Sequence, residues 1–355
     1  MQQATSLPQS IIDWLKISGF VFYFCGFWLF APPVIVCGSL YLLYVRLWAC
    51  VPFVSAYLAW YYYSRDWPEK GCMPWKWFRR NAHFVRWGGE YFDYEIVKTE
   101  DVSADKNYLV GSHPHGMICL SLMLSYAARP SFGDLYKGMR GYCVTLAGQF
   151  QWPLRRELLM WMGLLENVAK FCDFSHCAGV GSASKKNFDY LFGQKNTGQT
   201  VIVVVGGLNE SMMTCPGKYR LKLRDRKGFI RMAMSKGADL VPLYHFGENE
   251  LFKPVTGICP KRMRNMQAHI MNKIGFCIPF FVGKSLFGLP WGGLVPIRNK
   301  IATVIGSRIH VEKNENPTEE QVDLLHAAYC EKLNDLFDTH KGNYGIGPEE
   351  RLILY

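Results

Sequence analysis

Thr200-Val-Ile-Val-Val-Val205 is apolar and β-branched without alternation. Such a run is typical of a strand that is covered on both faces, as in the middle of a parallel sheet. Short β-rich runs alternate with helical ones along the chain, which predicts an α/β fold. The other expected strands are 91–97, 108–110, 141–146, 240–244 and 301–305. The expected helices are 117–128, 153–162, 183–192, 229–236 and 318–340, the last with a capping box at Thr318 and Gln321.

Tyr108-Leu-Val-Gly-Ser-His-Pro-His-Gly116 carries two histidines from an apolar strand into a turn. Pro114 favours an extended backbone at His113, and Gly116 relaxes the exit from the turn. Histidine can accept and return a proton near neutral pH, so this strand end is a candidate site for proton chemistry. The alternative is a pair of structural histidines with satisfied hydrogen bonds.

A candidate acid follows the strand 200–205, in Val205-Gly-Gly-Leu-Asn-Glu-Ser211. Neighbouring parallel strands end at one edge of a sheet, so loops that leave them can meet over one pocket. We therefore expect Glu210 near the two histidines. A His-x-x-x-x-Asp box of the glycerolipid acyltransferase kind is absent, because Leu120 stands where its aspartate would be relative to His115.

The N-terminal part predicts a membrane hairpin. The chain has 355 residues, of which 49% are hydrophobic, and segments 17–45 and 47–64 contain no charged residue. Residues 17–31 give only about 22 Å of helix against about 30 Å of hydrocarbon. We therefore expect a hairpin over 17–64 that turns at Pro32 and Pro33, with Pro52 leaving open whether it crosses the membrane or re-enters it.

Basic residues around the hairpin predict that the main domain faces the cytosol. Lys16 precedes it, and bases alternate with tryptophans through 65–90. This composition is typical of a segment at the lipid headgroups, the alternative being a linker with buried tryptophans. The expected organisation is a cytosolic tail at 1–16, the hairpin at 17–64, an interfacial segment at 65–90 and an α/β domain at 91–355.

Charge and cysteines exclude several classes of protein. The net charge of +11 suits nucleic acid, anionic lipid or a phosphorylated ligand, but no nucleic-acid motif is present. The twelve cysteines include no Cys-x-x-Cys, which indicates reduced thiols. Cys172, His176 and Cys177 match no zinc spacing, so no metal is expected. Segment 276–297, with Lys284 as its one charge, predicts a membrane-dipping loop, a wall of an acyl-chain tunnel or a core segment.

Eight blocks, taken together, resemble the diacylglycerol acyltransferase type 2 family, which includes monoacylglycerol and wax-ester acyltransferases. They are His113-Pro-His-Gly116, Thr145-Leu-Ala-Gly148, Val204-Val-Gly-Gly207 with Glu210-Ser211, Pro216-Gly217, Arg226-Lys-Gly-Phe229, Gly237-Ala-Asp-Leu-Val-Pro242, Phe246-Gly-Glu-Asn249, and Trp291-Gly292 with Leu294-Val-Pro296. Leu208 and Asn209 depart from the small residues expected before the glutamate, and His245 stands where serine is frequent. These departures put the acceptor in doubt.

The resemblance implies acyl-CoA-dependent O-acylation of a neutral lipid, with diacylglycerol as the first choice of acceptor and monoacylglycerol or a long-chain alcohol as alternatives. It implies a glycerolipid-acyltransferase-like mixed sheet flanked by helices. It also implies an endoplasmic reticulum membrane protein with a cytosolic catalytic domain, which could reach lipid droplets. Acyl-CoA is then a co-substrate and no cofactor is expected, while a homo-oligomer stays open.

The predicted catalytic residues are His115, His113 and Glu210. His115 would take the proton of the attacking hydroxyl, while Glu210 would orient the imidazole and stabilise its charged form. His113 is assigned to hydrogen bonding around the pocket, and exchanged roles of the two histidines stay open. Backbone amides near Gly116, or near Gly206 and Gly207, could hold the oxyanion, the alternative being simple turns.

Arg226 and Lys227 stand at the start of an expected helix, where the helix dipole disfavours cations. Their placement predicts an anionic ligand, and the phosphates of coenzyme A fit it, with Lys222 and Arg224 as further contacts. A solvated basic face is the alternative.

Three rival functions remain at this point. One is a hydrolase or acyl-enzyme transferase using Ser211 or Cys119, although no Gly-x-Ser-x-Gly elbow is present. A second is a non-catalytic lipid-droplet hairpin protein. The third is a zinc site on His113 and His115.

Overall fold

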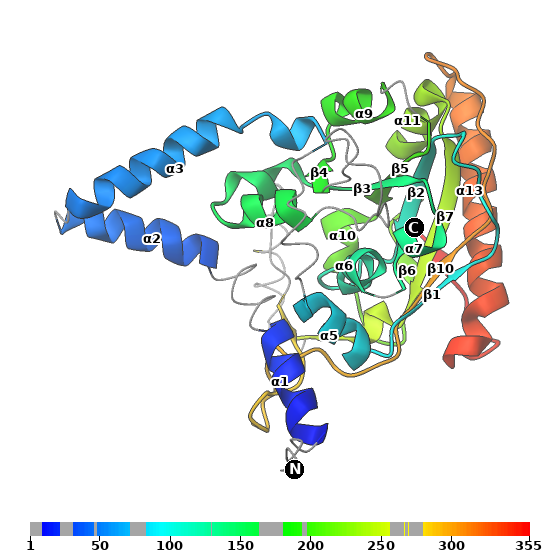
Figure 1. Cartoon of the computed structure of the whole chain (residues 1–355). Helices are drawn as coiled ribbons and strands as arrows, with labels where there is room; N and C mark the ends of the chain where they lie inside the picture. The colour runs from blue at the N-terminus through cyan, green and yellow to red at the C-terminus, as the bar shows by residue number, and fades with distance from the viewer. Residues whose placement is uncertain are drawn as a thin grey trace, which may run out of the picture.

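The computed structural model describes residues 9–21, 31–45, 48–71, 83–128, 130–162, 180–193, 197–255, 266, 269 and 280–355. At its centre is a sheet with the strand order β1-β10-β7-β2-β5-β3-β4 (Figure 1). The strands are β1 (Glu95–Lys98), β2 (Tyr108–His113), β3 (Arg140–Thr145), β4 (Val180–Ser182), β5 (Gln199–Val204), β7 (Asp239–Phe246) and β10 (Ala302–Ile305).

The sheet is mixed, which confirms the α/β prediction. Strands β7, β2, β5, β3 and β4 are parallel, β10 is antiparallel to β7, and β1 is parallel to β10. The apolar run predicted to be central forms β5, which lies between β2 and β3. The carboxyl ends of β2 and β5 therefore meet at one edge.

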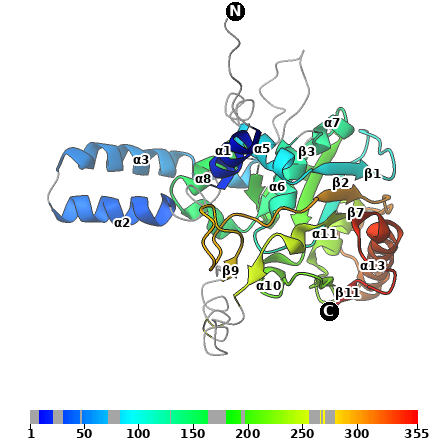
Figure 2. The same ribbon diagram turned by 90° about the horizontal axis from the view of Figure 1, so that it is seen from below.

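Helices cover both faces of this sheet (Figure 2). The chain moves one way along the sheet from β2 to β3 and the other way from β5 to β7, so right-handed crossovers place the two connections on opposite faces. The main helices are α5 (His83–Tyr91), α6 (Leu120–Ala127), α7 (Phe132–Leu135), α8 (Arg155–Met162), α9 (Lys185–Phe192), α10 (Gly207–Ser211), α11 (Gly228–Lys236) and α13 (Glu319–His340).

Short elements complete the described part of the chain. The two-residue strands are β6 (Arg220–Leu221) with β11 (Ile353–Leu354), and β8 (Lys253–Pro254) with β9 (Phe281–Val282). The 3-10 turns are η2 (Trp48–Cys50), η3 (Trp67–Glu69), η4 (Ala147–Gln151), η5 (Glu248–Glu250) and η6 (Lys341–Tyr344).

All five expected helices form, and the largest shift is at the start of the first. The segment expected to be helical from residue 117 becomes helical only at Leu120, because Gly116 and Cys119 have φ angles of 61°. A left-handed backbone cannot continue into an α-helix. The strand expected at 91–97 also starts later than predicted. Tyr91 is the last residue of α5, and β1 begins at Glu95.

Helix α13 packs along β7 and closes one face of the core. The predicted capping box is confirmed, because Gln321 donates its backbone N–H to Thr318 and accepts one from it. Its residues Val322, Tyr329, Leu333 and Leu336 are buried.

The predicted turn of the N-terminal hairpin is wrong. Helices α2 (Ala31–Tyr44) and α3 (Val51–Tyr63) both contact η2, form a V in Figure 1 and project from the sheet domain (Figures 1 and 2). Pro32 and Pro33 start α2 instead of turning the chain, because proline fits the first turn of a helix, where its missing N–H has no partner in any case. Helix α1 (Gln9–Val21) packs instead on α5, with Ile17 and Phe20 buried.

The paired helices expose large apolar side chains. Phe53 is 78% exposed, Trp48 72% and Tyr63 73%. Within the described residues, every helix falls short of the length or the apolar character that a membrane-spanning helix requires. Residues 72–82 of the predicted interfacial segment 65–90, the cysteine cluster at 172–177 and residues 276–279 lie outside the described residues.

Candidate active site

The His113-Pro-His-Gly116 turn leaves the carboxyl end of β2 and lies beside α10, which follows β5. The pairing of these strands brings Glu210 to His115, as the sequence predicted. Glu210 Oε1 accepts a hydrogen bond from the backbone N–H of His115 at 2.5 Å, and Oε2 accepts one from the backbone N–H of Lys222 at 2.9 Å. The carboxyl group is 2% exposed and ties the turn to the segment after β6.

The predicted bond between Glu210 and the imidazole of His115 is not the one that forms. His115 Nδ1 lies 3.0 Å from the carbonyl oxygen of Gly116. A carbonyl can only accept, so Nδ1 carries the proton and Nε2 is left as the basic nitrogen. Glu210 thus positions the main chain of His115, while the Gly116 carbonyl orients its ring.

Burial shifts the pKa values of both groups toward their uncharged forms. It lowers the pKa of His115 below its usual 6.5, although hydrogen bonds that the ring donates to backbone carbonyls oppose this shift. It raises the pKa of Glu210 to about 7, against the backbone bonds from His115 and Lys222 and the charge of Arg226. At neutral pH the imidazole is therefore uncharged, and the carboxyl lies near its midpoint of ionisation.

His113 is a fully buried residue in a different setting. Its Nε2 lies 3.0 Å from the hydroxyl of Tyr329, which itself donates to the Gly111 carbonyl at 3.2 Å. Tyr329 has one proton to donate, so His113 Nε2–H is the donor between the two side chains. Nδ1 has no hydrogen-bond partner among the described residues, and burial lowers the pKa of His113 to about 3. This geometry supports the structural assignment of His113.

His245, the departure from the family pattern, is also buried. Its Nε2 lies 2.9 Å from Ser112 Oγ, and its Nδ1 lies 2.8 Å from Thr303 Oγ1. Burial, aided by the neighbouring His113, lowers its pKa to about 3. The ring links β7 to β2 and β10 below the site.

Glu248 is a residue that the sequence reasoning did not single out. It lies just after β7 and is 2% exposed. Its carboxyl group accepts hydrogen bonds from Leu120 N at 3.1 Å, from Ser121 N at 2.7 Å and from Ser121 Oγ. Glu248 therefore places a carboxylate at the backbone of Leu120, the residue that stands where the aspartate of a His-x-x-x-x-Asp box would be. The Phe246-Gly-Glu-Asn249 block contained this residue, but spacing alone did not link it to α6.

We expect Glu248→Ala to lower the free energy of unfolding by about 1–3 kcal/mol, because it leaves two buried N–H groups of α6 without an acceptor. Denaturant unfolding of the purified protein measures the change. The exposed Glu312→Ala is the matched control and should unfold like the wild type. Equal stability of Glu248→Ala and the control would show that the cap has no stabilising role.

The structure gives a reason for glycine at each of the three positions predicted to hold the oxyanion. A Cβ at Gly206 would overlap the Glu210 carboxylate, and a Cβ at Gly116 would overlap Glu248. Both glycines thus allow a buried carboxylate to approach the backbone. Gly207 has a φ of 58° and open space around its Cα, so the left-handed backbone is what favours glycine there. Their predicted part in holding an oxyanion stays a prediction.

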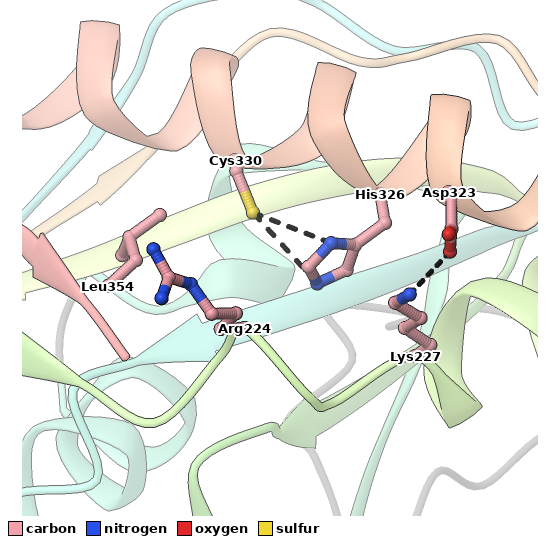
Figure 3. Close-up of a pocket in the computed structure, with 6 residues that line it drawn as sticks. All are labelled: Arg224, Lys227, Asp323, His326, Cys330 and Leu354. Carbon is pink, nitrogen blue, oxygen red and sulfur yellow. Dashed lines mark hydrogen bonds and ion pairs between the residues drawn. The ribbon is translucent and has the colours of Figure 1, made fainter.

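The four predicted acyl-CoA contacts lie on the segment between β6 and α11. Arg224 and Lys227 line a cavity of about 380 Å³ and face Asp323, His326 and Cys330 of α13 (Figure 3). Lys227 pairs with Asp323 at 2.5 Å, and Lys222 pairs with Asp225 at 3.0 Å. Part of the positive charge is therefore compensated within the protein. Arg224 is exposed, whereas Arg226 has a buried Nε without a hydrogen-bond partner among the described residues.

The geometry disfavours the nucleophile rivals. Ser211 is fully buried and donates its hydroxyl to the Met117 carbonyl at 2.6 Å. Burial, with the nearby charge of Glu248, raises the pKa of the Cys119 thiol well above its usual value. Among the residues that the structure describes, no group of three or more His, Cys, Asp or Glu side chains is arranged to hold a metal ion.

Comparison with known proteins gives a consistent result. A family model described as diacylglycerol acyltransferase matches residues 41–355. The chain is 37% identical to 2-acylglycerol O-acyltransferase 1 of Bos taurus over 299 residues, 84% of each protein. It is 35% identical to diacylglycerol O-acyltransferase 2 of Homo sapiens over 320 residues, 90% of this chain and 78% of the relative.

A solved structure was also compared. It is the 1-acyl-sn-glycerophosphate (LPA) acyltransferase PlsC of Thermotoga maritima, with a TM-score of 0.40 and 13% identity over 94% of this chain and 98% of that one. An overlap at this level does not bear on function.

Proposed function

Because the chain belongs to the diacylglycerol acyltransferase family and is an acyltransferase, we propose that it transfers an acyl group from acyl-CoA to the free hydroxyl of diacylglycerol, which forms triacylglycerol. The observation that carries the mechanism is the contact of His115 Nδ1 with the Gly116 carbonyl, from which the tautomer of the ring follows. With Nδ1–H bound to the Gly116 carbonyl, Nε2 is the free base on a turn that Glu210 holds in place.

The reaction needs one base and one positioned carboxylate. The acceptor hydroxyl attacks the thioester carbonyl while its proton passes to His115 Nε2. The carbon–sulfur bond then breaks, the ester forms, and the imidazolium returns the proton to the coenzyme A thiolate. General-base help of this kind contributes roughly 10²–10⁴-fold. Ionised Glu210 stabilises the imidazolium, because the low polarity around it strengthens their attraction.

The donor is proposed to bind by its phosphates along the segment 222–227. Arg224 is exposed at the mouth of the 380 Å³ cavity, beside Lys227. Lys227 and Lys222 could exchange their aspartate partners for phosphate oxygens, which bear more charge. The ion pairs of the two lysines with Asp323 and Asp225 support the alternative of a solvated basic face. Arg224 is therefore the main residue on which the proposed phosphate contact depends.

Monoacylglycerol is the second candidate acceptor. It is favoured by the 37% identity to 2-acylglycerol O-acyltransferase 1 of Bos taurus, similar to the 35% for the diacylglycerol enzyme. Both acceptors present a primary or secondary hydroxyl on a glycerol backbone, so the same base serves either.

The exposed helices α2 and α3 are proposed to anchor the enzyme in the membrane where its lipid substrates lie. Their exposed aromatic and aliphatic side chains favour insertion into lipid over exposure to water. The endoplasmic reticulum membrane, with the catalytic domain in the cytosol, and the lipid droplet surface are the proposed locations. Fluorescence microscopy of the chain with and without residues 31–63 tests this anchoring.

An acceptor panel tests the proposed reaction. Purified enzyme is given labelled acyl-CoA with diacylglycerol, monoacylglycerol or a long-chain alcohol in turn, and lipid products are separated. We expect labelled triacylglycerol from diacylglycerol. If only another alcohol is esterified, the proposed acceptor is wrong and the reaction class stands. If none of the alcohols yields a labelled ester, the proposed function is wrong.

The pH dependence of kcat/KM should show the ionisation of Glu210. Its pKa is raised to about 7, so acid below that pH protonates the carboxyl and removes its stabilisation of imidazolium. We expect the rate to fall as the pH drops through about 7. In Glu210→Gln the fall in kcat/KM on the acid side of the profile should move below pH 6.5, where His115 titrates.

Glu248→Gln is the matched control for this profile. Glu248 also has a pKa raised to about 7 by burial but accepts its bonds from α6 and not from His115. We expect the fall in kcat/KM near pH 7 to persist in Glu248→Gln. If the fall stays near pH 7 in Glu210→Gln, it belongs to a group other than Glu210.

A further inference from the structure

Strand β11 and the residue after it are tied to the chain just before Lys222. The strand pairs in parallel with β6, and Ile353 N donates to the Tyr219 carbonyl at 2.8 Å. Beyond the strand, Tyr355 N donates to the Leu221 carbonyl at 3.0 Å. These main-chain bonds join the segment 353–355 to the residues that lead into Lys222.

Tyr355 is also tied to the chain just after Lys222. Its main-chain oxygen accepts hydrogen bonds from Leu223 N at 3.0 Å and from Arg224 N at 3.1 Å. The main-chain bonds of Tyr355 therefore flank Lys222 on both sides. The N–H between these contacts, that of Lys222 itself, donates to Glu210 Oε2 at 2.9 Å.

The side chain of Tyr355 reaches the other segment that fixes Glu210. Its hydroxyl donates to Met213 Sδ at 2.9 Å. Met213 follows α10, and its backbone N–H donates to the Glu210 carbonyl at 2.9 Å. Tyr355 thus contacts the turn after α10 through its phenol and the segment 221–224 through its main chain.

We propose that Tyr355, held in place by β11, is a positioning residue of the acyl transfer that keeps the Lys222 N–H on the Glu210 carboxylate. The proposal rests on the function proposed above, in which ionised Glu210 stabilises the imidazolium of His115. An N–H donor binds a carboxylate more strongly than a carboxylic acid, so the Lys222 bond favours the ionised form. Without this bond Glu210 keeps its proton up to a higher pH.

The other groups that face Glu210 do not depend on this bond. The backbone N–H of His115 and the charge of Arg226 also lower the pKa of Glu210, whereas burial raises it. The ammonium group of Lys222 is paired with Asp225 at 3.0 Å. The remaining titratable neighbours are uncharged near pH 7, because burial raises their pKa values, and they are Cys119, Tyr244 and Tyr355.

The pH dependence of kcat/KM in Tyr355→Pro tests the proposal, because proline lacks the N–H that binds the Leu221 carbonyl. We expect the midpoint of the fall on the acid side to rise by about one pH unit, the scale of one hydrogen bond to a carboxylate. Relative to the wild type, kcat/KM then drops roughly fivefold at pH 7 and less than about twofold at pH 9. Tyr355→Phe keeps the main chain and the ring, so its midpoint should stay near 7.

Ile353→Pro is the second variant, because its side chain is 50% exposed and the ring of Tyr355 is kept. It removes the N–H that binds the Tyr219 carbonyl, and we expect its midpoint to rise by about half a pH unit or more. Ile353→Ala keeps that N–H and is the matched control. A variant with less folded enzyme loses rate by the same factor across the profile, so misfolding alone leaves the midpoint in place.

The outcomes separate the positioning role from the reaction. A midpoint at or below the wild-type value in Tyr355→Pro means that Tyr355 does not hold Glu210, and the acyl transfer stands. If Tyr355→Pro does not fold, the same result in Ile353→Pro decides. An equal rise in Tyr355→Phe or Ile353→Ala also overturns the main-chain role. If the wild type forms no labelled ester, the proposed function itself fails.

Discussion

Replacing His115 by alanine is expected to lower kcat by roughly 10²–10⁴-fold, the usual contribution of a general base. The ring is half-buried, and its recorded hydrogen bond is to the Gly116 carbonyl beside it. The bond from Glu210 goes to the backbone N–H, which alanine keeps. The variant should therefore fold and lose activity together with only a small change in stability.

The comparison needs a histidine that no part of the site uses. His340, at the end of α13, provides it, and His340→Ala should retain wild-type kcat. Esterification is measured with labelled acyl-CoA at saturating substrates, alongside thermal unfolding of each variant. A kcat of His115→Ala within about threefold of the wild type is far from a general base's contribution and would leave the mechanism without its base.

Arg156→Met is expected to lower the free energy of unfolding by about 3–5 kcal/mol, the usual cost of removing one partner of a buried ion pair. Arg156 is 1% exposed and donates to Glu157 Oε1 at 2.9 Å and to Ser64 Oγ at 2.9 Å. Glu157 also accepts from Tyr57 and Trp60 of α3, at 3.1 and 3.3 Å. The pair thus fastens α3 to α8, and without Arg156 a buried carboxylate is left uncompensated.

A double variant separates charge from packing in this junction. Arg156→Met with Glu157→Gln removes both charges, so we expect it to cost less than Arg156→Met alone. The exposed Arg351→Ala should not change the unfolding transition, since its partner Asp338 also pairs with Lys341. Unfolding in detergent micelles gives the comparison. Equal stability of Arg156→Met and Arg351→Ala would mean that the buried pair does not fasten the hairpin.

The part of the site that depends only on the order of the strands could be predicted from the sequence. β2 and β5 are neighbours and parallel, so the loops that follow them had to meet, and Glu210 does reach His115. The sequence does not reveal which atoms would touch. That depends on the local backbone of the turn, where the ring of His115 contacts the Gly116 carbonyl and its backbone N–H contacts the carboxylate.

Glu248 and the hairpin turn show where local patterns are insufficient. Glu248 follows β7 and caps α6 from more than a hundred residues away, a contact set by the register of β7 on β2 and not by any spacing near His115. Pro32 and Pro33 predict a turn, because proline interrupts helices. The same missing N–H makes proline a good first residue, and only the preceding chain decides between the two roles.

The most direct test of direct, base-assisted transfer is a chemical-quench experiment with labelled acyl-CoA and stoichiometric purified enzyme. With diacylglycerol or monoacylglycerol present, the account predicts that label moves from acyl-CoA to lipid ester and that none is bound to protein at any time. Labelled protein that forms without acceptor, passes its label to the lipid when acceptor is added, and is absent in Cys119→Ala or Ser211→Ala would contradict it.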